Sequence, residues 1–213
     1  MKRILSLISL AFLSLSCDSS GTIDPLSSPQ ITQPVATGIF ITTTRGPEVI
    51  GVWGSPADYF STSTSAASVP ADIAVDHSVR IERFTPIGTI PKNVLYSVPY
   101  PNPTNGSQTI TIAFPMKDAV SAWVVPARFA DAPDNDVSSY AGATVLSPVR
   151  QTVKVLVNDV LNAGEYSITF NPYPLPAGFY RIYVKIGETL MWHDILYYHD
   201  PSELPAGLKQ FLQ

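Results

Sequence analysis

Alternation of apolar and polar residues is clearest in the second half of the chain, where it predicts a series of short β-strands. In Thr109–Phe114, the side chains of Ile110, Ile112 and Phe114 fall on one face, as in a half-buried strand. The same pattern returns between turn residues in Val120–Val125, Val153–Val157, Tyr166–Phe170, Phe179–Ile186 and Leu190–Tyr198. Short strands at this spacing predict an all-β fold, namely an antiparallel β-sandwich over residues 94–198 that folds as a separable domain.

Residues 39–93 have weaker strand patterns and predict a β-rich N-terminal segment. Its candidate strands are Ile39–Thr43, Val49–Trp53 and Val79–Phe84, separated by turns and a polar loop. We expect these strands to form a small β layer packed on the sandwich. Residues 130–148 are polar and contain proline and glycine, and they predict a loop within the sandwich.

A proline-rich stretch, Leu95–Gly106, separates the two halves. Pro99, Pro101 and Pro103 fix φ and favour extended geometry in each preceding residue. Asn-Pro and Asn-Gly pairs then indicate turns. The stretch therefore predicts an extended lead-in that turns and enters the strand at Thr109.

The N-terminus has the pattern of a bacterial lipoprotein signal peptide, residues 1–16. Two basic residues precede an apolar run that is too short for a permanent membrane span, and a small residue, Ser16, directly precedes Cys17. The commonest lipobox has leucine three residues before the cysteine, where this chain has Ser14 with leucines on both sides. The alternative is ordinary secretory cleavage near Ser16, which would leave Cys17 as a free thiol.

Lipidation would place a thioether-linked diacylglycerol and an amide-linked acyl chain, such as palmitate, on Cys17. Two or more chains anchor a protein stably in a membrane. Residues 17–38 are rich in Ser, Thr, Pro and Gln and predict a flexible tether. We therefore expect a lipid-anchored protein of the bacterial membrane, in particular the outer membrane, on its periplasmic face or at the cell surface.

The composition of the chain limits its possible partners and disulfides. The 213 residues carry a formal net charge of -4 and only 14% charged residues, and no basic stripe indicates nucleic acid as a partner. The single cysteine excludes an internal disulfide.

After the sandwich, the tail 199–213 has Asp200-Pro201-Ser202-Glu203 near its start, which predicts a short helix through Leu208, Phe211 and Leu212.

Candidate chemistry is sparse. His77, His193 and His199 lack metal-ligand spacing, and we interpret them as scattered structural or surface residues. Asp131–Asp136 resembles a calcium loop but has Ser139 and Val145 where an EF-hand needs glycine and glutamate, so a solvated acidic turn is the favoured interpretation. No nucleophile elbow or phosphate-binding glycine loop is present. We expect no catalytic activity, metal or cofactor.

The aromatic residues allow two interpretations. Trp53, Trp123 and Trp192, with the tyrosine-rich strands, are compatible with a carbohydrate-binding platform. They are also typical of the core of a β-sandwich, which is the favoured interpretation. Tyr197 and Tyr198, at the end of the last predicted strand, fit either an exposed or a buried face.

Three motifs resemble one bacterial family over about half of the chain. They are Tyr100-Pro101-Asn102-Pro103 followed by Thr109–Ile112, Val155–Val157 with Ala163–Tyr166, and Leu175–Tyr180. Their order and spacing resemble the immunoglobulin-like module of flagellar hook-capping proteins and the related C-terminal sorting domain of type IX secretion cargo. The resemblance implies an immunoglobulin-like sandwich that acts as a structural, adhesive or sorting module without catalysis of its own.

The chain departs from that family in two places. Residues 130–148 are inserted where the family has a short turn, and the tail 199–213 continues past the last strand. The tail and the lipobox both weigh against a working sorting signal. The sequence therefore favours a non-enzymatic envelope lipoprotein that serves as a structural or protein-interaction module. The alternatives are a type IX sorting domain and a carbohydrate- or ligand-binding module.

Overall fold

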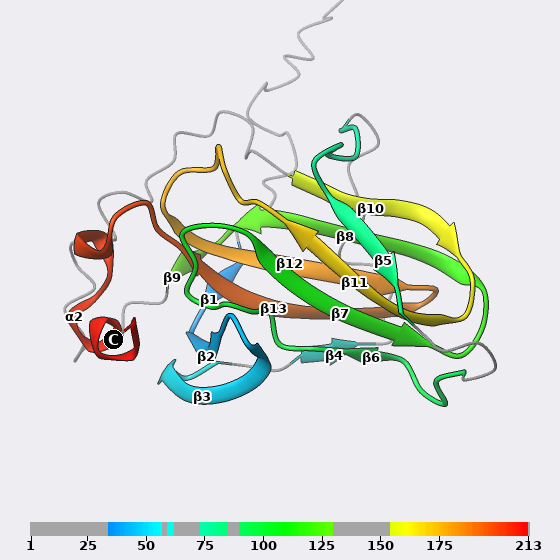
Figure 1. Ribbon diagram of the computed structural model, residues 1–213, viewed down its shortest axis with the longest axis horizontal. Helices are drawn as coiled ribbons and strands as arrows, with labels where there is room; N and C mark the ends of the chain where they lie inside the picture. The colour runs from blue at the N-terminus through cyan, green and yellow to red at the C-terminus, as the bar shows by residue number, and fades with distance from the viewer. Residues whose placement is uncertain (1–33, 57–58, 62–72, 85–89, 130–153, 213) are drawn as a thin grey trace, which may run out of the picture. The chain divides into compact units, whose positions relative to one another are not determined.

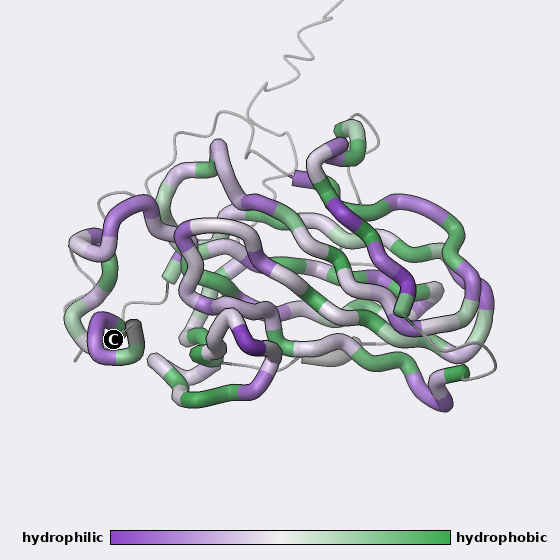
Figure 2. Tube along the Cα trace, in the orientation of Figure 1, coloured by the Kyte–Doolittle hydropathy of each residue, from purple (hydrophilic) through white to green (hydrophobic). Residues whose placement is uncertain are grey.

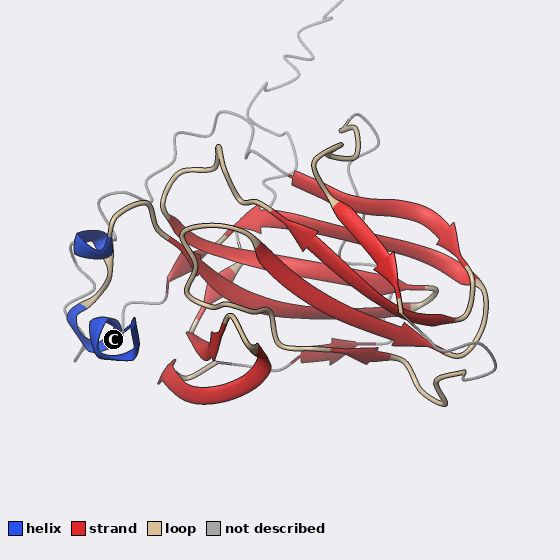
Figure 3. Ribbon diagram, viewed as in Figure 1, coloured by secondary structure: helices blue, strands red, loops and turns tan. Residues whose placement is uncertain are grey.

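Two antiparallel sheets stack on each other in the computed structural model, which describes residues 34–56, 59–61, 73–84, 90–129 and 154–212 (Figure 1). One sheet has five strands in the order β10 (Lys154–Leu161), β8 (Asp118–Pro126), β12 (Gly178–Ile186), β13 (Thr189–Tyr197) and β4 (Tyr59–Ser61). The other has four, in the order β5 (Arg80–Arg83), β11 (Gly164–Phe170), β7 (Gln108–Phe114) and β6 (Leu95–Tyr96). The predicted all-β class and sandwich architecture are confirmed, and among the described residues helix occurs only near the C-terminus (Figure 3).

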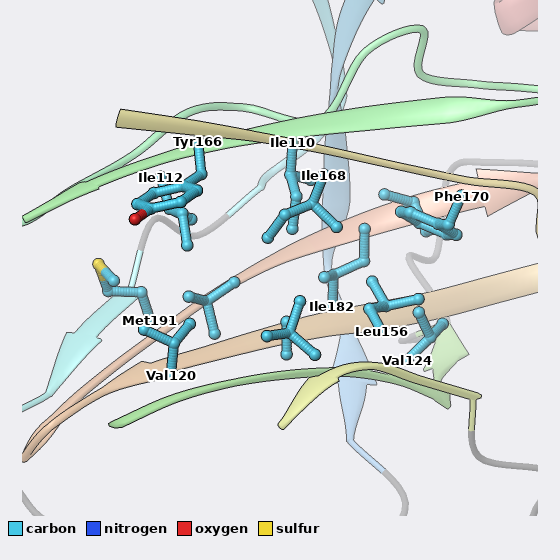
Figure 4. Packing of buried hydrophobic residues seen from close by; sticks show 14 of the residues in the cluster. Ile110, Ile112, Val120, Val124, Leu156, Tyr166, Ile168, Phe170, Ile182 and Met191 are labelled. Atoms are coloured by element: carbon cyan, nitrogen blue, oxygen red, sulfur yellow. The ribbon is translucent and has the colours of Figure 1, made fainter. Parts of the chain in front are cut away.

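The main core lies between the two sheets, and the predicted alternation explains it. Ile110 and Ile112 on β7 and Ile168 on β11 are fully buried and face Ile182 on β12 and its neighbours on the opposite sheet (Figure 4). Hydropathy alternates along these strands accordingly (Figure 2). The outer face of the four-stranded sheet carries polar side chains instead. On it, Thr109 and Thr169 lie side by side with hydroxyl oxygens 3.0 Å apart.

Strand pairing crosses the predicted boundary at residue 94. β5 pairs with β11 and extends the four-stranded sheet, while β4 pairs with β13 and extends the other. Of the residues assigned to the tether, Val35–Ala36 form β1, which runs parallel to β9 (Arg128–Phe129). Strand residues therefore occur before residue 39, and the N-terminal segment supplies strands to the sandwich itself.

A further layer covers the outer face of the five-stranded sheet near β1. The hairpin of β2 (Gly38–Thr43) and β3 (Gly46–Gly54) confirms two of the predicted N-terminal strands. Its Trp53 ring stacks on Phe179 of β12, with ring centroids 5.7 Å apart. The apolar cluster beneath this layer, which we call the outer cluster, comprises Ala36, Ile39, Ile41, Trp53, Ala127, Phe129, Phe179, Leu196, Tyr198, Leu204 and Leu208.

The C-terminal tail completes this layer, but not as the single helix that the sequence predicts. It forms η1 (Pro201–Glu203), α2 (Ala206–Lys209) and η2 (Gln210–Leu212). A capping box between Asp200 and Glu203 starts η1, and Pro205 then separates the turns because proline interrupts helical hydrogen bonding. Leu208 is fully buried in the outer cluster, and Phe211 packs against it, so these two side chains contact the sandwich.

Among the described residues, no helix has the length and apolar character needed to span a membrane.

Candidate functional site

Several predicted features fall outside the described residues. They include Cys17, the acidic segment Asp131–Asp136, the predicted loop 130–148 and the tether as far as residue 33. In the part of the chain that the structure describes, no three His, Cys, Asp or Glu side chains come together as a metal site would require.

The three histidines have different surroundings. His77 and His199 are exposed, and the ring of His199 contacts that of Tyr197 edge-on. His193 is buried on β13 with its ring against Tyr96, at a centroid distance of 4.8 Å, and against Phe40. Their placement fits the interpretation of the histidines as structural or surface residues.

The aromatic side chains are mostly packed into the protein. Trp53 lies in the outer cluster, and Trp123 is 2% exposed in a smaller cluster with Val155 and Leu190. The ring of Tyr183 stacks on Trp123, and Trp192 is half-buried beside them. Tyr197 and Tyr198 are both buried, which decides between the two faces that the sequence left open.

Asn102, in the proline-rich stretch, is a buried polar residue with three side-chain hydrogen bonds. Its side chain is fully buried, and its amide nitrogen donates to the carbonyls of Phe40 on β2 (3.0 Å) and Asp194 on β13 (3.1 Å). Its amide oxygen accepts from the backbone N–H of Leu196 (3.1 Å). One side chain thus joins the N-terminal hairpin to the last strand of the sandwich.

Backbone bonds reinforce this junction, which we call the proline seam and define as residues 99–104. The N–H of Thr42 donates to the Asn102 carbonyl, and the Thr42 hydroxyl donates to the Pro99 carbonyl. Tyr100 exchanges backbone bonds with Thr109 on β7, and Thr104 does so with β13 and the residue after it. The peptide bonds preceding Pro101 and Pro103 are cis. The seam therefore connects the hairpin and both sheets, rather than serving only as a lead-in to β7.

A second polar cluster lies on the outer face of the five-stranded sheet. Arg181 on β12 and Asp194 on β13 are paired directly across the strands and form a two-pronged ion pair, at 2.6 and 2.8 Å. The side chains are only 12% and 3% exposed. Burial raises the pKa of Asp194, and the hydrogen bonds from Arg181 oppose that rise. The guanidinium also lies over the Trp192 ring and donates to the Val35 carbonyl at 2.9 Å.

A third polar contact fastens the segment before β5 to β10. The ammonium of Lys154 pairs with Asp76 at 2.6 Å and donates to the carbonyls of Asn171 and Tyr173. Burial raises the pKa of Asp76, but hydrogen bonds from Lys154 and Ser78 outweigh it and lower the pKa to about 2. The backbone of Asp76 also donates to the carbonyl of Val155.

Exposed strands differ in the character of their surfaces. β5 is exposed along its length and carries the charged residues Arg80, Glu82 and Arg83. Charged side chains on an edge strand commonly protect a sheet from pairing with another chain. β3 instead exposes β-branched apolar residues, with Val49, Ile50 and Val52 at 41–49%. This strand is the most apolar exposed element in the described part of the hairpin layer.

Comparison with known proteins gives no match: no family model, no curated protein and no solved structure corresponds to this chain. The sequence pattern indicates the proline-rich stretch but not the role of Asn102, Arg181 or Asp194. In the sequence, Arg181 is one of the polar residues that alternate with apolar ones along β12, so no local pattern indicates that it is buried.

Proposed function

We propose that this protein is a non-enzymatic bacterial lipoprotein, anchored through Cys17, whose sandwich acts as a structural or protein-interaction module of the cell envelope. The observation that carries the proposal is the chain's single cysteine directly after Ser16, at the end of an apolar run of signal-peptide length. The first described strand, β1, begins 18 residues later, at Val35. The intervening residues supply a spacer between the lipid and the folded region.

The strand order supports an immunoglobulin-like assignment. If β6, β7, β8, β10, β11, β12 and β13 are lettered A, B, C, C′, E, F and G, the sheets read A-B-E and C′-C-F-G. β5 occupies the place of strand D beside strand E, although it precedes strand A in the sequence. This order supports the proposal of an immunoglobulin-like sandwich with one strand contributed by the N-terminal segment.

Tyr180 adds a second feature of that class. It lies near the start of β12, and its hydroxyl donates to the carbonyl of Pro176, four residues upstream, at 2.6 Å. This bond resembles the tyrosine corner that immunoglobulin-like domains have near the start of strand F. Trp123 differs from the strand C tryptophan of antibody domains, because it packs on the outer face of its sheet rather than between the sheets.

A structural role is also supported by how the buried polar side chains are used. Thr42, Asn102 and Gln108 bond to backbone carbonyls in or near the proline seam, and Asp194 is bound by Arg181. These bonds hold strands together, which supports a structural role for the groups that make them.

The experiment compares the wild-type protein and Cys17→Ala in cells supplied with a fatty-acid analogue. The wild-type protein should be labelled and should sediment with membranes, since several acyl chains bind a bilayer stably. Cys17→Ala should be unlabelled and soluble. Labelling and membrane sedimentation that persist in Cys17→Ala would show that the anchor is elsewhere and would refute the proposal.

A further inference from the structure

The described chain begins at a point where the sandwich itself holds it. Val35–Ala36 pair in parallel with Arg128–Phe129, and the carbonyl of Pro34 accepts from the N–H of Arg128 at 2.8 Å. Ala36 is fully buried in the outer cluster. A two-residue strand makes few bonds of its own, so its position depends on additional contacts.

Arg181 supplies such a contact. One terminal nitrogen of its guanidinium, Nη2, donates both to Asp194 (2.8 Å) and to the carbonyl of Val35 (2.9 Å), while Nε donates to the second carboxylate oxygen. The planar group also lies 5.0 Å from the centroid of the Trp192 ring. Because the carboxylate and the ring fix the guanidinium on two sides, the second N–H of Nη2 is already directed at β1 before β1 docks.

We propose that the Arg181–Asp194 pair is a latch that holds the N-terminal strand β1 on the sandwich, so that the chain arriving from Cys17 is fastened to the centre of the five-stranded sheet. Arg181 is a positioning residue in this device: it binds the carbonyl of Val35 through a fork that Asp194 orients. β12 and β13, which carry the pair, are neighbours in the interior of the sheet. The latch therefore connects the entry point of the chain to strands that are hydrogen-bonded on both sides.

The consequence for the anchored protein rests on the proposed function. With the latch closed, any pull from a lipid at Cys17 reaches β12 and β13 directly. With it open, residues 34–36 would join the spacer and the sandwich would be held only from Thr37 onward, which exchanges two hydrogen bonds with Ser55. The latch itself does not depend on the lipid, so its test can fail while lipidation of Cys17 holds, and the reverse.

Two neighbouring amides distinguish a latch from a general support of the sheet. The N–H of Arg128 bonds to Pro34 and reports the docking of β1, whereas the N–H of Ala127 bonds to Phe179 on β12 and reports the sandwich. Residue-resolved hydrogen exchange on the full chain in detergent measures both. Replacing both partners, Arg181→Met with Asp194→Leu, removes the ion pair without leaving a buried charge unpaired.

In this double variant, we expect exchange at Arg128 to become at least about tenfold faster while exchange at Ala127 stays within about threefold of wild type. The matched control is Arg80→Met, which removes an exposed ion pair on β5 and should change neither amide. If Arg128 exchanges at its wild-type rate in the double variant, or if both amides accelerate equally, the latch is refuted.

A second variant keeps the test decisive if the double variant does not fold. Arg181→Lys leaves a cation beside Asp194 but removes the fork that reaches Val35. The same selective acceleration at Arg128 is expected, and its absence in this folded variant would likewise overturn the proposal.

Discussion

Replacement of Asn102 by alanine is the most informative perturbation of the fold. Asn102 is fully buried, and its side chain makes hydrogen bonds of 3.0, 3.1 and 3.1 Å to backbone groups of Phe40, Asp194 and Leu196. These partners lie 62 to 94 residues away along the chain. A single substitution therefore removes all three bonds by which the Asn102 side chain joins the proline seam to β2 and β13.

The expected loss of stability follows from the groups left behind. The carbonyl of Asp194 and the N–H of Leu196 would remain buried without their bonds, and the carbonyl of Phe40 would remain partly buried. The cost is about 1–3 kcal/mol for each buried group. Because a shared cavity allows some relaxation and such terms are not strictly additive, we expect a total of about 3–6 kcal/mol. Domains of this size have a free energy of unfolding of about 5–15 kcal/mol, so the variant should be severely weakened or unfolded at 37 °C.

Urea unfolding followed by far-UV circular dichroism and tryptophan fluorescence measures this loss. The matched control is Asn105→Ala, which changes an exposed asparagine of the same stretch and should alter stability by no more than about 0.5 kcal/mol. The urea midpoint and the measured m-value give the free energy of unfolding of each variant. If these free energies differ by less than about 1 kcal/mol between Asn102→Ala and Asn105→Ala, the seam does not hold the layers together.

Three further predictions concern the hairpin layer, acid stability and the limits of the folding unit. Gly38→Ala should displace the hairpin and cost about 1–3 kcal/mol in a thermal melt, because its Cβ would lie 2.5 Å from backbone atoms, whereas Gly106→Ala has open space and should be neutral. The pKa of Asp76 is about 2, below its ordinary 3.8, so its ionised form stabilises the fold by about 2 kcal/mol above pH 4. This contribution is lost as pH falls toward 2, and Asp76→Asn should make the free energy of unfolding less dependent on pH over that window. A fragment of residues 95–198 lacks β4, β5 and the residues that cover the outer cluster, so it should aggregate or show no cooperative melt. A fragment of residues 34–213 should melt cooperatively, and equal cooperativity in both fragments would show that the N-terminal strands are dispensable.

The last of these expectations differs from what the sequence alone indicates. Alternation identified the strands of the sandwich because its period of two depends only on which side chains face the core, as in β7 and β12. It assigned the sandwich to residues 94–198 because those patterns are strongest there. Pairing partners such as β5 with β11 are set by tertiary contacts between segments about 85 residues apart, and no local pattern reports them.

The proline seam shows the same limit at a single residue. Asn102 stands between two prolines, where an asparagine is typical of an exposed turn. Its burial depends on carbonyls that β2 and β13 bring to it, so its local sequence gives the opposite impression. The tail differs from the predicted single helix for a reason that the sequence itself contains. Pro205 interrupts the helix, and the chain turns there before Leu208 packs into the outer cluster.

The anchor at Cys17 is tested most directly by intact-mass and fragment mass spectrometry of the mature protein extracted from bacterial membranes. The proposal predicts an N-terminus at Cys17 that carries a thioether-linked diacylglycerol and an acyl chain on its amino group. A mature protein that begins at another residue, or that begins at Cys17 with an unmodified thiol, would contradict it.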